Sequence, residues 1–258
     1  MFNIKDIKKV ICDTHGEYES SLWEFKGSET WSGCLECTKA RLSLKHKERC
    51  IQGVKERQQL AIQSLLKRSA IPVGFNNVSF DNYNLDDGEE QSKVFNLCKR
   101  FATNFKVAKQ NNVQGVFFGN TGTGKTSLAI SIIKKVIEDG NTAIFTSMAD
   151  IAYAIKETFN NDGRTEHMVL QGFIDIDLLV IDECGVNFNE FNKEKLFYII
   201  NKRFEKCNPT IIITNNLDDF EERIGSRVFS RMQLSSFILN FNWQDYRKKL
   251  IPTPNKPI

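Results

Sequence analysis

The octapeptide GNTGTGKT, from Gly119 to Thr126, constrains the fold of this chain more than any other feature. It matches the phosphate-binding pattern G-x-x-x-x-G-K-[ST] at every fixed position. The apolar run GVFF precedes it, and a helical pattern follows from about Lys125 to Asp139. The motif requires this order of strand, loop and helix, because backbone N–H groups of the loop surround phosphate at the positive end of the helix. The sequence therefore predicts an α/β nucleotide-binding domain.

Apolar runs and helical patterns alternate beyond this loop. We expect further strands at TAIFT, DIDLLVID, TIIIT and SSFILNF, which are residues 142–146, 175–182, 210–214 and 235–241. We expect further helices at about 149–159 and over the periodic segment 190–206. Short β-branched runs that alternate with helices indicate βαβ units. We therefore predict a mainly parallel, five-stranded sheet.

The glycine loop and the run LLVIDE together predict an ATP and Mg²⁺ site. The expected phosphate ligands are Gly119, Asn120, Thr121, Gly122, Thr123, Gly124, Lys125, Thr126 and Ser127. Lys125 can reach the β- and γ-phosphates, and the Thr126 hydroxyl can ligate Mg²⁺. Asp182 ends a buried strand and can hold Mg²⁺ through water, whereas Glu183 is placed to activate the attacking water. The alternative is an acidic strand end without a role.

Two polar motifs follow the later strands. TIIITNN places Asn215 and Asn216 after a buried strand, where an amide can orient water or contact the γ-phosphate; we prefer Asn215. Asn also makes caps and turns, which is the alternative. IGSRVFSRM carries Arg227 and Arg231 four residues apart, on one face of a predicted helix. In an oligomeric ATPase such a face meets the neighbour's nucleotide, although pairing with the glutamates just upstream is also open.

The N-terminal segment carries two short-spaced pairs of metal-ligating residues. Cys12-x-x-His15 and Cys34-x-x-Cys37 are separated by eighteen residues that include several aromatics. This spacing is typical of a structural zinc site with four protein ligands. A segment of this size has too little core to fold alone, so Zn²⁺ would supply the missing stability.

Residues 38–70 lack proline and are strongly basic. They carry nine Lys and Arg against two Glu, a local charge of +7 in a chain of net charge +3. We expect a largely helical segment, with Gly53 as a possible break. Its charge suggests nucleic acid or an acidic partner, or only a solvated helix face. His46 and Cys50 lie four apart here and could replace the first ligand pair, although the surrounding cations disfavour a dication.

Composition excludes several classes of protein. The 258 residues suffice for one α/β domain and a small appendage, and 41% hydrophobic with 26% charged residues is typical of soluble globular proteins. No apolar run approaches a membrane span, and the N-terminus lacks a secretory signal, so we expect a cytoplasmic protein without a membrane partner. Seven cysteines without such a signal argue against a disulfide framework.

The ordered set of motifs resembles the DnaC-type loaders of the replicative helicase, which are AAA+ ATPases of the initiator/loader group. The resemblance runs from about Leu65 to Arg247 and is carried by KRSAIP, NNVSFDNYN, GNTGTGKT, SMADIAYAIKETFNNDG, DLLVIDECGV, TNN, GSRVFSRM and FNWQDYR. It implies a P-loop AAA+ domain that binds ATP and Mg²⁺. Known loaders have an all-helical N-terminal region, from which the Cys and His pairs depart.

The resemblance also implies roles for single residues. Asn215 falls on the family's first sensor, and Arg231 matches its arginine finger, with Arg227 one turn earlier. Arg247 matches the second sensor, but only eleven residues follow it, so the lid must be abridged. The segment SMADIAYAIKETF corresponds to the helical element with which loaders and initiators touch single-stranded DNA. Tyr153 could stack there and Lys156 could contact phosphate, although an ordinary packed helix is the alternative for both.

These observations predict a zinc-binding module at 1–37, a basic helical partner-binding segment at 38–70 and an AAA+ ATPase domain at 71–258. We expect an ATP-dependent replication protein that loads a DnaB-type hexameric helicase onto single-stranded DNA. Its ATPase domains would self-assemble when the partner is bound. The alternatives are a transposition-type AAA+ ATPase regulator and a zinc-bearing nucleic-acid adaptor with a slow ATP switch.

Overall fold

The computed structural model describes residues 3–246, with gaps at 26, 161–162, 164, 185–188, 219 and 235. The chain divides into two compact units, Met1–Ala61 and Ile62–Ile258. Within the described residues, every helix is too short or too polar to cross a membrane.

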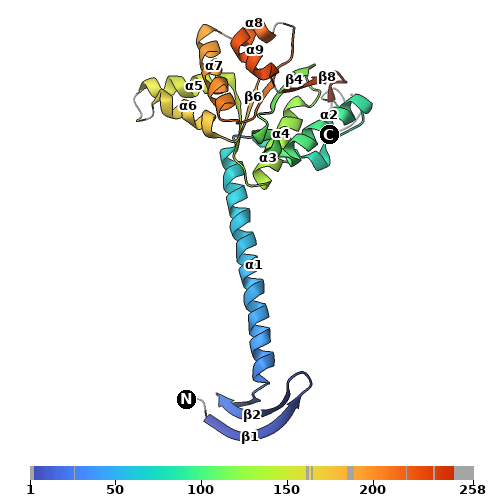
Figure 1. Cartoon of the computed structure of the whole chain (residues 1–258), viewed down its shortest axis with the longest axis vertical. Coiled ribbons are helices and arrows are strands. Elements are labelled where there is room, and N and C mark those ends of the chain that lie inside the picture. The colour runs from blue at the N-terminus through green and yellow to red at the C-terminus, as the bar shows by residue number, and fades with distance from the viewer. Residues whose placement is uncertain are drawn as a thin grey trace, which may run out of the picture. The chain divides into compact units, whose positions relative to one another are not determined.

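The first unit contains a small antiparallel sheet of three strands in the order β1-β2-β3 (Figure 1). These strands are β1 (Asn3–Cys12), β2 (Gly16–Phe25) and β3 (Ser28–Trp31). The register pairs Cys12 with Gly16, so a tight turn over residues 13–15 joins the first two strands. We had placed no strand in this region from the sequence. The strands escape the sequence pattern because β1 has no buried face, and even its Ile7 and Ile11 are exposed.

Helix α1 (Leu35–Arg68) follows the small sheet and runs through Gly53 without a break. The expected interruption at this glycine is therefore wrong. A glycine inside a helix costs only about 1 kcal/mol relative to alanine, which the many strong helix formers around it offset. The last turns of α1 belong to the second unit, where Ile62, Leu65 and Leu66 pack against the hydrophobic core.

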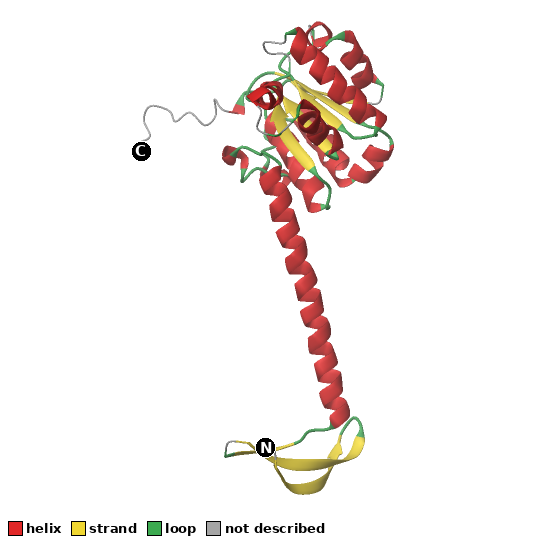
Figure 2. Ribbon diagram, turned by 90° about the vertical axis from the view of Figure 1, so that its left-hand side faces the viewer, coloured by secondary structure: helices red, strands yellow, loops and turns green. Residues whose placement is uncertain are grey.

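The second unit is built on a parallel five-stranded sheet, as the sequence predicts (Figure 2). The strands are β4 (Gln114–Gly119), β5 (Ala143–Ser147), β6 (Leu178–Asp182), β7 (Thr210–Ile213) and β8 (Ser236–Phe241), in the order β5-β6-β7-β4-β8. Every pairing is parallel, and β4 lies between β7 and β8. The strand predicted from Asp175 begins only at Leu178, because Asp175 is the last residue of a helix.

Helices cover both faces of this sheet (Figures 1 and 2). They are α2 (Glu89–Thr103), α3 (Phe105–Gln110), α4 (Lys125–Glu138), α5 (Met148–Glu157), α6 (Glu166–Asp175), α7 (Glu190–Glu205), α8 (Phe220–Ile224) and α9 (Ser226–Gln233). Short 3₁₀ turns lie at η1 (Val73–Phe75), η2 (Phe80–Asn82) and η3 (Thr158–Asn160). Alternate strand residues enter two separate cores. Phe117 packs with α2, α3 and α4, whereas Val116 packs with α5, α6 and α7.

A buried arginine holds the amino-terminal ends of strands β6 and β7, at the side of the sheet opposite the glycine loop. Arg203 of α7 is fully buried, and its guanidinium donates to backbone carbonyls at the end of α6 and to Pro209 just before β7. Its Nε also donates to Thr210 Oγ1 at 2.9 Å. These acceptors offset the cost of burying the cation. The contact ties α6, α7 and β7 together and so fixes the strands whose other ends form the site.

Candidate nucleotide site and candidate metal centre

A cavity of about 440 Å³ opens at the carboxyl ends of β4, β6 and β7. The residues that we predicted from the sequence to line it are Thr121, Gly122, Thr123, Gly124, Lys125, Thr126, Ser127, Asp182, Glu183, Asn215 and Asn216. Ligands of open parallel α/β sheets bind at this edge, because the loops after neighbouring strands meet there. The cavity therefore has the position expected of a nucleotide site.

The glycine loop leads into the N-terminal end of α4. Gly122 and Gly124 have φ values of 75° and 89°, a left-handed conformation that glycine adopts without strain. Lys125 is 7% exposed, and its Nζ donates to the carbonyls of Gly119 at 2.8 Å and Asn120 at 2.6 Å. The ammonium is therefore already held at the mouth of the loop.

Oxygen ligands suited to Mg²⁺ meet beside the loop. Thr126 Oγ1 donates to Asp182 Oδ2 at 2.8 Å, and the backbone N–H of Glu183 donates to Asp182 Oδ1 at 2.7 Å. A hydroxyl and a carboxylate fit this hard cation, which is commonly held by one or two carboxylates, water and substrate phosphates. The Glu183 side chain is exposed and follows directly, so a carboxylate stands next to the cation position.

The two asparagines after β7 both line the cavity. Asn216 Oδ1 accepts a hydrogen bond from the backbone N–H of Asp218 at 3.1 Å, which makes the turn considered as an alternative. This contact engages the amide of Asn216. Asn215 therefore remains the better candidate for a contact with phosphate or water.

Arg227 and Arg231 lie together on α9, beside a second, more open hollow that Phe197 also lines. The Arg231 Nε donates to Asn201 Oδ1 at 3.0 Å, and its guanidinium lies over Phe204. These partners come from α7, whereas the cavity of the glycine loop is lined by a different arginine, Arg223 of α8. Arg227 and Arg231 thus line a hollow other than the chain's own candidate nucleotide site.

The remaining predicted site residues have different surroundings. Tyr153 and Lys156 lie on the exposed side of α5, whose buried residues include Ile151 and Ile155. Tyr153 is 64% exposed, and a hydrogen bond from its hydroxyl to Glu157 raises its pKa. Arg247 falls outside the described residues.

Sequence reasoning missed several residues that shape the cavity, and Arg223 is one of them. Tyr83 and Trp243 line it, Asp245 lies against Gly122, and Lys134 donates to the carbonyls of a segment that forms its wall. Tyr83 and Trp243 stand in NNVSFDNYN and FNWQDYR, which we used only as marks of the resemblance. No spacing rule connects these segments to the loop, because the contacts join residues that are distant along the chain.

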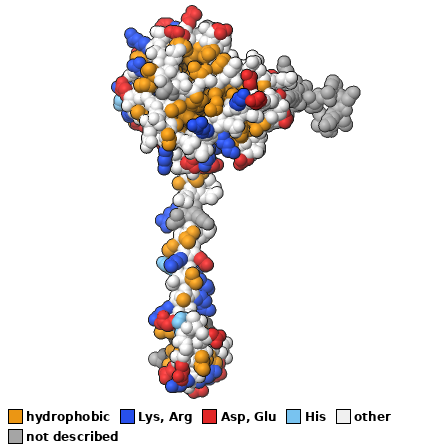
Figure 3. Space-filling view, turned by 45° about the vertical axis from the view of Figure 1, so that its right-hand side comes forward, with side chains coloured by type: hydrophobic (Ala, Val, Ile, Leu, Met, Phe, Trp, Pro, Cys, Tyr) orange, Lys and Arg blue, Asp and Glu red, His pale blue; other side chains and the backbone are white. Residues whose placement is uncertain are grey.

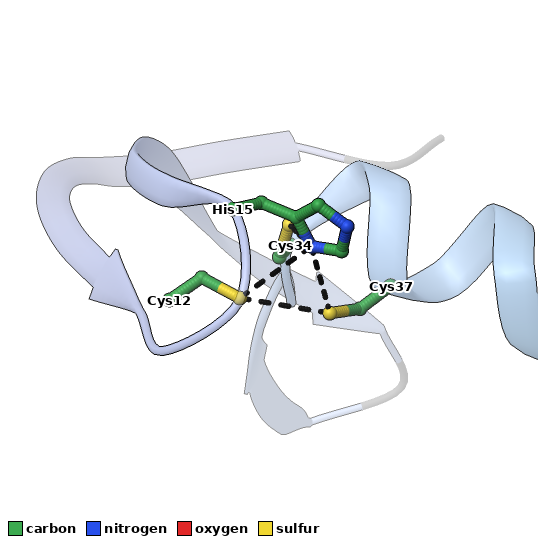
Figure 4. A group of neighbouring side chains, drawn as sticks. All are labelled: Cys12, His15, Cys34 and Cys37. Atoms are coloured by element: carbon green, nitrogen blue, oxygen red, sulfur yellow. Dashed lines mark hydrogen bonds between the residues drawn. The ribbon is translucent and has the colours of Figure 1, made fainter.

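The first unit brings Cys12, His15, Cys34 and Cys37 together (Figure 4). One ligand atom from each residue lies within 4.8 Å of all the others. His15 Nδ1 is 3.3–3.7 Å from the three sulfur atoms, and the Sγ atoms of Cys12 and Cys37 are 3.6 Å apart. A tetrahedral ion with Zn–S bonds of about 2.3 Å and a Zn–N bond of about 2.05 Å requires ligand separations of about 3.8 Å and 3.6 Å, so the cluster fits zinc.

Local structure explains this convergence. Cys12 ends β1, His15 lies in the following turn, and Cys34 and Cys37 flank the start of α1. Backbone N–H groups of Thr14 and His15 lower the pKa of the Cys12 thiol to about 6, which favours the thiolate that zinc requires.

Among the described residues, the alternative pair His46 and Cys50 does not join Cys34 and Cys37 in a cluster. His46 and Cys50 contact each other on α1, with 3.6 Å between Nε2 and Sγ, but they lie outside the four-residue cluster. The turn after β1 brings the first ligand pair to the second, so no ligand is required from the middle of the helix.

The sequence of this chain is similar to a known protein family and to individual proteins. A family model described as IstB-like ATP binding protein matches residues 44–244. The replicative helicase loader DnaC of Escherichia coli (strain K12) is 32% identical over 199 residues, which cover 76% of this chain and 80% of that protein. An uncharacterized protein of the same strain, YdaV, is 28% identical over 207 residues, which cover 79% of this chain and 82% of that protein.

Solved structures show the same fold. The DnaC helicase loader has a TM-score of 0.59 at 23% identity, covering 66% of this chain and 99% of that chain. The replication initiator DnaA, bound to AMPPCP and single-stranded DNA, has a TM-score of 0.56 at 19% identity, covering 64% of this chain and 50% of that chain. At these identities the likeness concerns the α/β domain and its sheet.

Proposed function

The chain belongs to the family of IstB-like ATP-binding proteins, and from this membership we propose that it is an ATP-hydrolysing loader of a replicative ring helicase. The observation that carries the proposal is the 32% identity with the helicase loader DnaC over 80% of that protein's length. The region that the family model matches, residues 44–244, contains every residue that lines the cavity apart from Tyr246, so the family match includes the site and not only the scaffold.

The cavity has the groups that ATP hydrolysis requires. On binding, Lys125 would exchange its loop carbonyls for β- and γ-phosphate oxygens, and Thr126 with Asp182 would hold Mg²⁺. The metal ion supplies charge neutralisation of the phosphates when bound. Glu183 would accept the proton of the attacking water, and Asn215 would orient that water or the γ-phosphate.

The arginine pair on α9 favours hydrolysis in an assembly. Arg231 and Arg227 line a hollow that is separate from the chain's own nucleotide cavity. A guanidinium that approaches a neighbour's γ-phosphate can stabilise charge in the transition state. We therefore assign Arg231, with Arg227 as second choice, to the site of an adjacent subunit.

The Arg231→Ala variant tests this assignment. ATP affinity of the isolated protomer should stay within about 2-fold of wild type, while hydrolysis in the assembled, partner-bound state should fall by at least about 10³-fold. Equilibrium ATP binding and turnover with partner measure the two quantities. An equal loss of ATP binding by the protomer would place Arg231 in its own site or in the fold.

Single-stranded DNA is the second expected ligand. Tyr153 exposes its ring on α5, and Lys156 lies one turn further on the same side. An exposed aromatic ring beside a cation suits base stacking combined with phosphate contact. We propose this face of α5 as the DNA contact.

The first unit and the basic helix are the proposed docking part. The Cys and His cluster would hold one structural Zn²⁺, and Lys and Arg side chains line α1 together with exposed apolar ones such as Leu44 and Ile51 (Figure 3). We propose that residues 1–37 and 38–70 address the helicase and that the ATPase domain, 71–258, acts on it.

Copurification with a DnaB-type hexameric helicase tests the proposed function. A loader should bind the hexamer stoichiometrically with ATP, and a chain that lacks residues 1–37 should bind at least about 10-fold more weakly. Binding to a transposase in place of the helicase would favour the transposition-type regulator. Binding to nucleic acid alone would favour the adaptor.

A further inference from the structure

One carbonyl of the glycine loop receives hydrogen bonds from two distant side chains. The Thr123 carbonyl accepts from Trp243 Nε1 at 2.8 Å and from Tyr83 Oη at 3.3 Å. Tyr83 precedes the first strand of the parallel sheet, whereas Trp243 follows the last one. Two aromatic residues from opposite ends of the ATPase domain thus converge on a single peptide group of the loop.

The direction of this carbonyl fixes the direction of the next N–H group. All described peptide bonds are trans, so the N–H of Gly124 points away from the Thr123 carbonyl. Gly124 is the N-cap residue of α4, and N–H groups at this position of a phosphate loop face the nucleotide. Because Trp243 and Tyr83 hold the Thr123 carbonyl, they also fix the direction of the Gly124 N–H on the other side of the same peptide.

The segment Phe241–Tyr246, which we call the C-terminal strap, also holds neighbouring peptides of the loop. The backbone N–H of Tyr246 donates to the Gly122 carbonyl at 3.0 Å, and the N–H of Asn120 donates to the Phe241 carbonyl at 3.2 Å. The strap therefore contacts the loop at Asn120, Gly122 and Thr123 and not at a single point.

The contacts of Tyr83 and the strap with the loop require glycine at two loop positions. A Cβ on Gly124 would lie 2.6 Å from Tyr83 Oη, and a Cβ on Gly122 would lie 1.6 Å from Asp245 Oδ1. Both glycines also have positive φ. Their absence of a side chain thus admits the strap and Tyr83 as well as the phosphates.

Neighbouring aromatic rings hold both donors in place. The Tyr83 ring stacks on Phe95 of α2 with centroids 5.7 Å apart, and the Trp243 ring lies 5.0 Å from Phe241. Burial raises the pKa of the Tyr83 hydroxyl, which keeps it protonated as a donor. Each donor is therefore directed at the loop before any nucleotide arrives.

We propose that Trp243 and Tyr83 are positioning residues that preset the phosphate loop for nucleotide by fixing the peptide between Thr123 and Gly124. The inference rests on the proposed nucleotide site but concerns residues outside the glycine motif. Removal of one donor weakens the hold on the carbonyl but leaves the other hydrogen bond in place. Loss of both donors frees the peptide to rotate, and the Gly124 N–H then has no fixed direction.

A double-mutant cycle with Tyr83→Phe and Trp243→Phe tests the proposal. Each substitution removes one donor and keeps the ring. Each single variant should raise the Kd for both ATP and ADP by about 3-fold, within the range expected for one hydrogen bond. The double variant should raise both by more than the product of the singles, by about 30-fold or more. KM should rise in parallel, while kcat at saturating ATP should stay within about 2-fold of wild type.

Matched controls are available in the same chain. Tyr198→Phe on α7 and Trp31→Phe in the small sheet make the same changes away from the loop and should leave both Kd values unchanged. Unaltered nucleotide affinity in the double variant would overturn the proposal. So would strictly multiplicative effects, or a lowered unfolding midpoint without a change in affinity. Wild-type ATP binding and helicase binding test the proposed function separately, because the cycle is scored only relative to wild type.

Discussion

Glu183 has a backbone conformation that costs energy. Its φ of 53° is left-handed, which costs a non-glycine residue roughly 1–2 kcal/mol. The backbone N–H of this residue donates to Asp182 Oδ1, so the turn that strains Glu183 also orients the carboxylate that we propose as a metal ligand. The side chain of Glu183 is exposed, as a base that accepts a proton from water would need to be.

The Glu183→Gln variant should bind ATP normally and hydrolyse it at least about 100-fold more slowly, because an amide cannot accept the proton of the water. Equilibrium ATP binding and steady-state phosphate release measure the two effects. Glu222→Gln on α8 is a matched control and should keep wild-type turnover. Turnover of the Glu183 variant within about 3-fold of wild type would exclude Glu183 as the base.

Single site residues can be predicted from the sequence where they lie close together in one motif or one run. Lys125 and Thr126 follow from the spacing of one motif, and Asp182 follows from an apolar run that ends in an acid. Tyr83 and Trp243 could not be found in this way. They meet at Thr123 only after the chain segments before and after the sheet have packed on the loop, and spacing carries no record of that contact.

Helix α4 supports the nucleotide cavity at both its start and its middle. Its first residue is Lys125, and its Lys134 donates to the carbonyls of Phe75, Asn76 and Val78 at 3.0, 2.7 and 2.6 Å. Phe75 and Val78 line the cavity. Burial lowers the pKa of Lys134, and the three carbonyls offset the cost of burying its charge. One side chain thus fastens a wall of the site to the helix that carries the loop.

Lys134→Met should loosen this wall. Removal of the ammonium leaves three carbonyls without their donor, so we expect the Kd for ATP to rise by about 5- to 10-fold. The inhibition of ATP binding by tripolyphosphate should remain unchanged. Lys135→Met is the control, since that neighbour pairs only with exposed Asp139 and should bind ATP as wild type does. Equal effects of the two substitutions would contradict the assignment.

Elements could be predicted from the sequence where burial is extensive. Four of the parallel strands, β4 to β7, are short and largely buried apolar runs that stand out from the helices between them. The strands of the first unit have little buried surface, so their residues show no such pattern. The possible helix break at Gly53 also does not occur, because a glycine breaks a helix only where other factors favour a break.

The two units of the molecule differ in what stabilises them. The second unit contains two extensive hydrophobic clusters. In the described part of Met1–Ala61, only Ser20 and Cys34 are buried. So few buried residues cannot supply the stability of a folded domain, and a structural metal is a common remedy in small folds. We therefore propose that the stability of the first unit comes chiefly from Zn²⁺ bound by its Cys and His cluster.

Purified protein should carry about one zinc ion per chain, since the four clustered Cys and His side chains would make one four-ligand site. Protons compete with zinc for thiolates, so the ion should be lost as the pH falls, and chelator or mild acid should unfold the first unit while ATP binding survives. Cys34→Ser should lose zinc, whereas Cys50→Ser should retain it, as measured by metal analysis. Zinc-free native protein, or zinc loss from the Cys50 variant, would contradict this ligand set.

Delivery of a DnaB-type hexamer to closed circular single-stranded DNA tests the central claim most directly. The circle has no end for threading, so the amount of helicase that remains on it after a salt wash measures opening and loading of the ring. We predict that this chain with ATP raises the amount of helicase retained on the circle at least about 10-fold over helicase alone. Lys125→Ala, which deletes the loop's cation, should give only the background level. Retention that is unchanged by the chain, or raised equally by the Lys125 variant, would contradict an ATP-dependent helicase loader.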